Sequence, residues 1–413
     1  MNFLTSLKFR LLLLLAVVGP GLITAFADND AGGVATYSVA AAKFGYNIHL
    51  TFIPITIVLM ISQEIGGRIA VVTGKGLADL IRERYGIRIS LLIFALLCFV
   101  NFAVILQDIG GLKAGLELFH INILIFLPLI LLGLLYFITK TSYAKIEKFF
   151  LLLTFFYIAY LLSAILAKPD WGLHVKSIFI PYQPIHLDYL YTSIAVLGTT
   201  VTAWGQFFIN SYVKDKKLTI DKLKINQWEM YVGAFLTNAV SMLMMIAVIA
   251  TVWVHHSQIT DAATAALAIK PFAGAFAGVL FGLGLIIAGF IGAAIVPLAT
   301  AYAFSEFFGY EGSLDVKFNK SKLFYGLFFV QIIIGMLFTL LPQLSLFQFT
   351  ILADFLNGLF LPVIFFFLYR IANNEELMGK HKNTKFQNIL LVGSGIVITI
   401  GALVGGIGEL LHF

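Results

Sequence analysis

The sequence predicts an all-α integral membrane protein with eleven transmembrane helices. Hydrophobic residues make up 60% of the 413 residues and charged residues only 12%, which is far from the composition of a soluble globular domain. Eleven apolar stretches are long enough to cross roughly 30 Å of hydrocarbon. The connections between them are mostly short, and none has the Pro, Ser or Gly content of a linker to a soluble domain. We therefore expect residues 1–413 to form a single transmembrane domain.

The first apolar stretch lacks a small-residue cleavage site and is too long for a signal-peptide core, so we expect it to remain as a membrane helix. The single cysteine, Cys98, lies in an apolar run and excludes an intrachain disulfide. The eleven predicted segments, in chain order, cover residues 11–42, 46–72, 90–119, 122–139, 146–167, 188–213, 227–254, 272–307, 322–341, 347–371 and 386–410.

The distribution of Lys and Arg predicts the orientation, because positive residues favour the cytoplasmic side of a membrane. Most of the 27 basic residues fall on the side that holds the N-terminus. The opposite side keeps only Lys43, Lys168, Lys176 and Lys270. We therefore expect a multi-pass protein of the inner (cytoplasmic) membrane, with its N-terminus in the cytoplasm and its C-terminus outside. The net charge of +6 then follows from topology and requires no nucleic-acid partner.

Segments 1 and 6 differ from the others because polar runs interrupt them, DNDAGG from residue 28 and GTTVTAWGQFFINS from residue 198. Interrupted helices at corresponding positions of two halves indicate a transporter with an inverted repeat and a site at the membrane midplane. The spacing favours a five-plus-five plan, with a first repeat at about 11–167, a second at about 188–371 and an extra helix at about 386–410. The alternative is that the glycines only allow close helix packing.

The two interruptions contain the oxygen groups that a cation site requires. We expect Gly32 and Gly33 to unwind segment 1, which would free carbonyl oxygens beside a carboxylate that is costly at membrane depth. Segment 6 can add the carbonyl of Thr199 and the hydroxyl of Thr202, with Gln206 one turn further on. All of these are hard oxygen groups, which suit magnesium, manganese or calcium better than copper or zinc.

Two further acidic residues each leave two interpretations open. Asp354 is either a second acid of the site or a hydrated group near the outer end of its helix. Asp108 either lines the ion pathway or forms a structural ion pair with Lys113 or Lys43.

Glu64 and Arg68, at i and i+4, predict an intrahelical ion pair near the cytoplasmic side. The sequence contains no HExxH or GxGD motif and no Ser–His pairing at membrane depth, so we expect no enzyme activity.

Several motifs together resemble one known family. TAFADNDAGGVATYS, QEIGGRIAVVTGKGLADLIRERYG, LGTTVTAW, IVPLATAYAFSEFFG and NGLFLPVIFFF are similar, in order and over nearly the whole chain, to the natural resistance-associated macrophage protein family of divalent-metal transporters. The resemblance is strongest to its NRAMP-related magnesium transporter branch, which shares the Asp-Asn-Asp-Ala-Gly-Gly run. It implies a LeuT-like fold of two inverted repeats with broken helices 1 and 6.

The resemblance also implies a ligand set. The family's Asp-Pro-Gly-Asn motif falls on residues 30–33, so Asp30 would be the acidic ligand, Gly33 stands where the asparagine ligand would be, and Ala27 would supply a backbone carbonyl. The family's Met-Pro-His falls on Thr202, Ala203 and Trp204.

A hydroxyl therefore replaces the sulfur that favours soft metals, and a tryptophan that carries no proton replaces the histidine. Gly33 and Gly205 leave room for a partly hydrated ion such as magnesium.

We therefore expect an alternating-access transporter or uniporter of hard divalent cations, magnesium and also manganese, without tight proton coupling and without a resident cofactor. Its partners would be the ions and the lipid bilayer, and the chain would be a monomer. One alternative is a proton-coupled manganese or iron transporter, and another is a sodium-coupled symporter of organic solutes. The residues expected around the ligands or along the pathway are Asp28, Asn29, Asp108, Gln206, Asp354 and Glu64, and those expected at the helix breaks are Gly32, Gly33 and Gly205.

Overall fold

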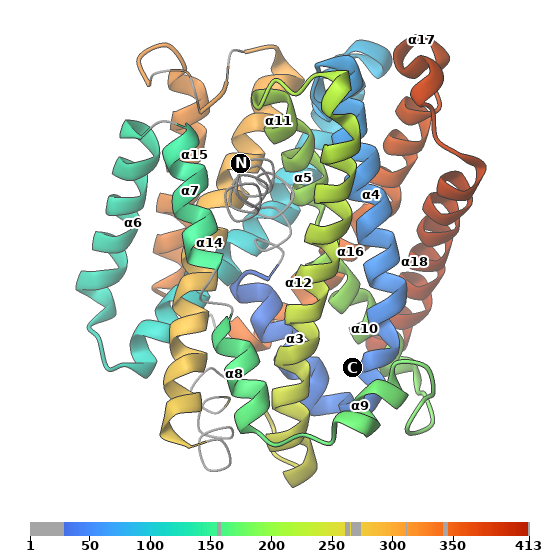
Figure 1. Ribbon diagram of the computed structural model, residues 1–413. Coiled ribbons are helices and arrows are strands. Elements are labelled where there is room, and N and C mark those ends of the chain that lie inside the picture. Colours follow the sequence, from blue (N-terminus) through green and yellow to red (C-terminus); the bar gives the residue numbers. More distant parts are fainter. Residues whose placement is uncertain are drawn as a thin grey trace, which may run out of the picture.

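The computed structural model describes residues 29–141, 143–154, 158–260, 265, 274–310, 312–314, 316, 318–341 and 346–411. Every regular element in these ranges is an α-helix or a short 3-10 helix. Nine stretches of the described chain are long and apolar enough to cross a membrane. Most of the helices run side by side along one direction (Figure 1).

The first half of the chain forms the helices that correspond to predicted segments 1 to 5. They are α3 (Ala31–Phe44), η1 (Gly45–Thr51), α4 (Phe52–Thr73), α5 (Leu77–Leu118), α6 (Ile123–Lys140), α7 (Tyr143–Thr154), α8 (Ile158–Leu166) and α9 (Trp171–Ser177).

The second half corresponds to predicted segments 6 to 11. Its elements are α10 (Leu187–Thr200), α11 (Ala203–Asp215), η3 (Ile220–Lys222), α12 (Leu223–Thr251), η4 (Trp253–His255), α14 (Ala275–Phe308), α15 (Lys322–Thr339), α16 (Leu346–Ala372), α17 (Glu375–Met378), η5 (Gly379–His381) and α18 (Lys385–Leu411).

Two predicted boundaries differ from the structure by more than five residues. Segment 2 was expected from residue 46, but α4 begins at Phe52 after a 3-10 turn. Pro54 lies in the first turn of α4, where its missing N–H leaves no hydrogen bond unmade. Segment 3 was expected from residue 90, but α5 begins at Leu77 and bends at Gly86, whose φ of 78° favours glycine.

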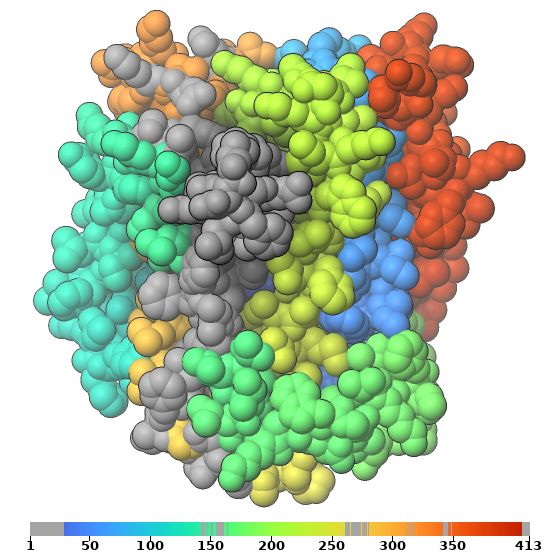
Figure 2. Space-filling view, viewed as in Figure 1, coloured from blue at the N-terminus to red at the C-terminus, as the bar shows by residue number. Residues whose placement is uncertain are grey.

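The outer helices present apolar side chains away from the bundle. Leu124 and Leu129 of α6 are 68% and 61% exposed, and Ile389 and Val397 of α18 are 69% and 66% exposed. Figure 2 shows α6 and α18 along opposite edges of one face. Exposed leucine, isoleucine and valine in such density are typical of a surface that contacts lipid.

Glycines bring the central helices into close contact. A Cβ on Gly198 of α10 would lie 2.0 Å from the Asp354 carbonyl and 2.5 Å from the Gly358 nitrogen of α16. A Cβ on Gly111 of α5 would lie 2.1 Å from the Ala31 side chain. Small residues therefore let α10 approach α16 and let α5 approach α3, which is the packing mode favoured in membranes.

Gly198→Ala tests this packing. The added methyl group overlaps backbone atoms that cannot rotate away, so we expect a loss of stability of about 1–3 kcal/mol, the usual range for overpacking. Thermal melting of the purified protein in detergent measures it. Gly393→Ala is the matched control, because a Cβ at Gly393 in α18 meets nothing within 4 Å. Equal melting temperatures for the two variants would contradict the packing account.

Candidate metal-ion site

Two residues outside regular helix, Val201 and Thr202, separate α10 from α11. The Thr202 side chain accepts a hydrogen bond from the Gly205 amide at 3.1 Å, and Asn357 Oδ1 accepts one from the Ala203 amide at 2.9 Å. A continuous helix would direct the Ala203 amide to the carbonyl of Thr199. Because Asn357 takes this amide, the Thr199 carbonyl loses its usual donor and is available to a cation.

The start of α3 and helix α10 both lie in the lower half of the molecule as it is drawn in Figure 1. Asp30 is the N-cap of α3, and its Oδ1 accepts a hydrogen bond from the Gly33 amide at 2.7 Å. Asp108 of α5 accepts a hydrogen bond from the Ala31 amide at 3.2 Å. Two carboxylates therefore meet at one helix N-terminus, where free amides and the helix dipole stabilise negative charge. The expected carbonyl ligand Ala27 and the neighbouring Asp28 lie outside the described residues.

The predicted role of the glycines at the helix breaks was wrong. Gly32 and Gly33 lie inside the first turn of α3, and Gly205 lies inside the first turn of α11. The described helices begin at polar N-caps, Asp30 and Thr202, and therefore need no glycine to end the regular structure. Gly32 has another function, because a Cβ there would lie 2.9 Å from the side-chain amide of Gln107.

Asp354 joins a third helix to this region. The Thr36 hydroxyl of α3 donates to Asp354 Oδ2 at 2.5 Å, and the side chain of Thr199 also forms a hydrogen bond with this carboxylate. Thr350 donates to the Gly32 carbonyl at 3.1 Å. Asp354 is only 1% exposed, so the alternative of a hydrated group at the outer end of its helix was wrong.

Asp108 is completely buried, and its Oδ2 has no hydrogen-bond partner among the described residues. It does not form the structural ion pair considered from the sequence. Lys113 donates to the Thr339 carbonyl at 2.9 Å, and Lys43 pairs with Asp188 at 3.2 Å. A glycine at position 292 of α14 makes room for the Asp108 carboxylate, because a Cβ there would lie 2.1 Å from Oδ1.

The three carboxylates of Asp30, Asp108 and Asp354 interact electrostatically with one another. Each is at most 1% exposed. Helices α5, α11 and α16 also hold buried polar atoms that have no partner in the described part of the chain, namely Gln107 Oε1, Asn357 Nδ2, Trp204 Nε1 and both amide atoms of Gln206. Unpaired polar atoms in a core are costly unless water or an ion meets them.

Asn29 serves as an anchor for the start of α3. Its Nδ2 donates to the Thr237 carbonyl at 3.0 Å and also to the Thr237 hydroxyl, and its Oδ1 accepts from Ser241 at 2.6 Å. Both partners belong to α12. Asn29 therefore fixes the position of its neighbour Asp30 relative to α12.

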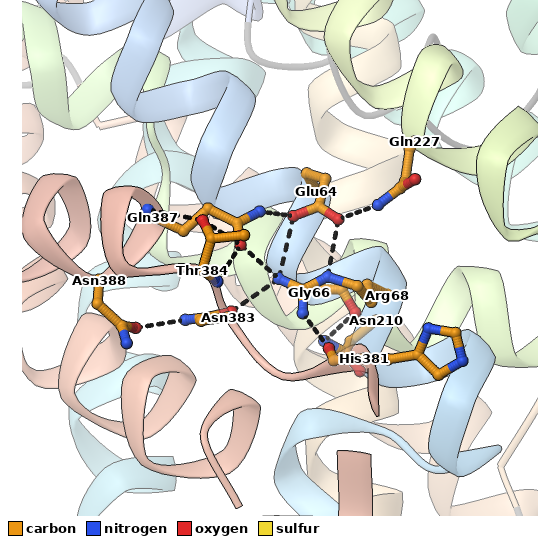
Figure 3. Close-up of polar contacts among 10 residues, drawn as sticks. All are labelled: Glu64, Gly66, Arg68, Asn210, Gln227, His381, Asn383, Thr384, Gln387 and Asn388. Carbon is orange, nitrogen blue, oxygen red and sulfur yellow. Dashed lines mark hydrogen bonds and ion pairs between the residues drawn. The ribbon is translucent and has the colours of Figure 1, made fainter. Parts of the chain in front are cut away.

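Glu64 belongs to a separate polar network (Figure 3). The predicted ion pair with Arg68 is confirmed, with Nε 2.8 Å from Oε1. Gln227 of α12 and Gln387 of α18 also donate to the Glu64 carboxylate, at 2.7 and 2.8 Å. Arg68 in turn donates to Asn383 Oδ1 at 2.7 Å and to the His381 carbonyl. Glu64 thus joins α4 to α12 and α18.

The arrangement of Asp30, Asp108, Asp354, Thr199 and Thr202 offers carboxylate, carbonyl and hydroxyl oxygens. In the described ranges no three His, Cys, Asp or Glu side chains converge as the cage of a bare metal ion would require. A hard cation that keeps part of its water shell fits better, since it needs only one or two carboxylates.

Four residues that form hydrogen bonds in this region were not predicted from the sequence, namely Thr36, Gln107, Thr350 and Asn357. The available signal was the spacing of Thr350 and Asp354 at i and i+4, which places both on one face of a helix.

The chain was compared with known proteins. The family model described as natural resistance-associated macrophage protein-like matches residues 21–406. A relative, the divalent metal cation transporter MntH of Klebsiella pneumoniae subsp. pneumoniae, is 24% identical over 407 residues, which cover 96% of this chain and 95% of the relative.

Solved structures share the fold. The manganese transporter of Eremococcus coleocola in complex with an aromatic bis-isothiourea substituted compound superposes with a TM-score of 0.75 at 18% identity, over 95% of this chain and 86% of that one. MhsT in complex with L-phenylalanine gives a TM-score of 0.53 at 14% identity, over 94% of this chain and 97% of that one. The predicted all-α, LeuT-like fold class is thereby confirmed.

Asn357→Leu tests the start of α11. Without the Oδ1 acceptor the Ala203 amide is buried unpaired, which costs about 1–3 kcal/mol. We expect a lower melting temperature in detergent. Asn357→Asp keeps the acceptor and is expected to melt closer to the unmodified protein. A leucine variant that melts as the unmodified protein does would show that the Ala203 amide has another partner.

Proposed function

The chain belongs to the natural resistance-associated macrophage protein family, and from this premise we propose that it transports divalent metal cations across the membrane. The observation that carries the proposal is the group of three buried carboxylates, Asp30, Asp108 and Asp354, without a cationic side chain paired to them among the described residues. Ionisable residues at membrane depth mark ion pathways because burying them is otherwise unfavourable. The names of the relatives, a divalent metal cation transporter and a manganese transporter, support transport rather than enzyme activity.

In this proposal Asp30 is the charged ligand, and Thr199 and Ala27 supply carbonyl oxygens. Thr202 contributes its hydroxyl directly or through water, and Gly33 leaves space beside Asp30. Asp354 adds a second carboxylate, which attracts a divalent ion more strongly than a neutral side chain would. Asp108, Gln206 and Asp28 line the path on either side.

Magnesium is the proposed ion, with manganese as a second substrate. The oxygen-only donor set supports both, because neither ion requires sulfur or imidazole. Trp204 supports transport without tight proton coupling, since an indole does not titrate and its Nε1 only donates.

The second candidate is a proton-coupled manganese transporter. The name of the solved manganese transporter favours manganese as the ion, and the three buried carboxylates could carry protons in place of a histidine. A sodium-coupled symporter of organic solutes shares the fold, but Asp30 and Asp354 would repel an organic carboxylate.

The proposed cycle is alternating access, in which the ion site opens first to one side and then to the other. We propose that the N-terminus lies in the cytoplasm and the C-terminus outside, that the chain forms two inverted repeats with α18 added, and that it works as a monomer in the inner membrane.

Asp30 offers a test that separates charge from helix capping. Asp30→Asn keeps an oxygen for the Gly33 amide but removes the charge, so we expect magnesium uptake into proteoliposomes to be abolished while the protein melts normally. Asp30→Ala removes both, and loss of the cap should cost a further ~1 kcal/mol of stability. Normal uptake by Asp30→Asn would refute the assignment of this carboxylate as the ligand.

Thr202 offers a test of ion preference. Thr202→Met brings a thioether to the site, so we expect cadmium uptake to appear, because soft ions prefer sulfur. Thr202→Ala is the control for the lost cap on the Gly205 amide and should gain no cadmium uptake. Thr202→Ser should keep the original ion profile. If the methionine variant showed the same ion profile as the unmodified protein, Thr202 would not contact the ion.

A further inference from the structure

A row of polar side chains runs along α11 through an otherwise apolar core. Thr202, Gln206, Asn210 and Lys214 follow one another at intervals of four residues, which places successive members on adjoining parts of one helix face. We call these four residues the polar stripe. The large side chains between them are buried and apolar or aromatic, namely Trp204, Phe207, Phe208, Ile209, Tyr212 and Val213.

The middle of the polar stripe is buried and incompletely paired. Gln206 is 1% exposed, and neither of its amide atoms has a partner among the described residues. Asn210 is completely buried. Its Nδ2 donates to the Gly66 carbonyl of α4 at 2.8 Å (Figure 3), whereas its Oδ1 accepts nothing from any described residue. Buried amides of this kind are costly unless water or an ion meets them.

A neighbouring helix adds a further amide. Asn226 of α12 is 1% exposed, and both of its amide atoms lack partners in the described part of the chain. Its Oδ1 lies 2.8 Å from the position of a Cβ on Gly67. The glycine pair of α4 therefore accommodates two asparagines, because Asn210 lies against Gly66 and Asn226 against Gly67. In the last third of α4 the glycine pair therefore makes room for the side chains of two neighbouring helices, Ile209 and Asn210 of α11 at Gly66 and Asn226 of α12 at Gly67.

The polar stripe ends at a cavity of about 320 Å³ lined by Asp79, Lys214 and Glu306, among others. The Lys214 ammonium lies 2.7 Å from Asp79 Oδ2 and 3.5 Å from Glu306 Oε1. Glu306 is 4% exposed, and its Oε2 has no hydrogen-bond partner among the described residues. Asp215 and Lys217 also line the cavity, and Arg82 lies 3.6 Å from Asp79. The polar stripe therefore ends at a group of paired acids and bases, and Lys214 lies between Asp79 and Glu306 in this conformation.

We propose that the polar stripe is the cytoplasmic leg of the cation route, which runs from Thr202 past Gln206 and Asn210 to the cavity at Asp79 and Glu306. This inference rests on the proposed function. Amide oxygens can replace the waters of a hydrated ion or accept hydrogen bonds from them, and the carboxylates of Asp79 and Glu306 interact favourably with its charge. Displacement of Lys214 from Asp79 and Glu306 opens the end of the route.

Gln206→Leu and Asn210→Leu test the route, with Ile209→Leu as the matched control. Ile209 is completely buried on the same helix but lies in an apolar cluster with Ala70 and Met230. We expect magnesium uptake into proteoliposomes to fall by about tenfold in both leucine variants, the change produced by a barrier about 1.4 kcal/mol higher. Ile209→Leu should transport at the rate of the unmodified protein.

A second measurement separates the route from the ion site. Stabilisation of the protein by magnesium in a melting experiment reports binding at Asp30, and we expect both leucine variants to keep it. Uptake at the unmodified rate by both variants would overturn the route. Loss of uptake together with loss of magnesium stabilisation would also overturn it, because these residues would then act at the ion site. Absence of divalent uptake by the unmodified protein would overturn the proposed function itself.

Thiol labelling keeps the inference testable if a leucine variant does not fold. The chain has one cysteine, so Cys98→Ser provides a background without thiols. In it, Asn210→Cys should react with a small, membrane-impermeant cationic thiol reagent applied at the Lys214 end of α11 during transport. Ile209→Cys should stay unmodified. Equal protection of both positions would overturn the route.

Discussion

The central structure depends on the burial of three carboxylates that have no lysine or arginine paired to them in the described part of the chain. A carboxylate inside a membrane protein is several kcal/mol less stable than in water unless another group compensates its charge. Here the compensation comes from helix starts and hydroxyls. The amides of Gly33 and Ala31 hold Asp30 and Asp108, and the hydroxyl of Thr36 holds Asp354. The proposed function rests on the carboxylate oxygens that this partial compensation leaves available to a cation.

The same constraint explains why the helices are interrupted where they are. A helix start supplies free amides for an anion, and a helix end supplies free carbonyls for a cation. α10 ends at Thr200, where Asn357 withdraws the Ala203 amide from the Thr199 carbonyl. One interruption therefore provides a capped helix start and an available oxygen within four residues. Close approach of α10 to α16 at Gly198 brings Asp354 to the same place.

The sequence predicted the class of fold, because long apolar stretches have few structural solutions in a membrane. It also located the polar interruptions of segments 1 and 6 and Thr199 and Thr202 within the second, since polar residues are conspicuous in an apolar chain. Asp30 was chosen among the acids of the first interruption through the resemblance to the family motif. The sequence did not predict how Asp354 is held, because Thr36 and Asp354 are 318 positions apart and no local pattern links them. The role of the glycines was wrong for a related reason. Only the packed structure shows that Gly32 faces Gln107, whereas the local pattern fits a helix break equally well.

Two polar networks of the structure differ in how completely their atoms are paired. One is the ion pair of Glu64 and Arg68, and the other is the polar stripe of α11. The Glu64 carboxylate has both oxygens paired, whereas Gln206 and Asn210 keep unpaired atoms in the described structure. A saturated network holds helices together, and an unsaturated row can exchange partners with a passing ion or with water.

The most direct test of the central claim is uptake into proteoliposomes that contain a magnesium-sensitive dye and a pH dye together, with manganese in a parallel set. We expect magnesium entry without acidification, because the proposed site is lined by oxygen atoms and lies beside Trp204. Manganese entry with acidification and no magnesium entry would contradict it.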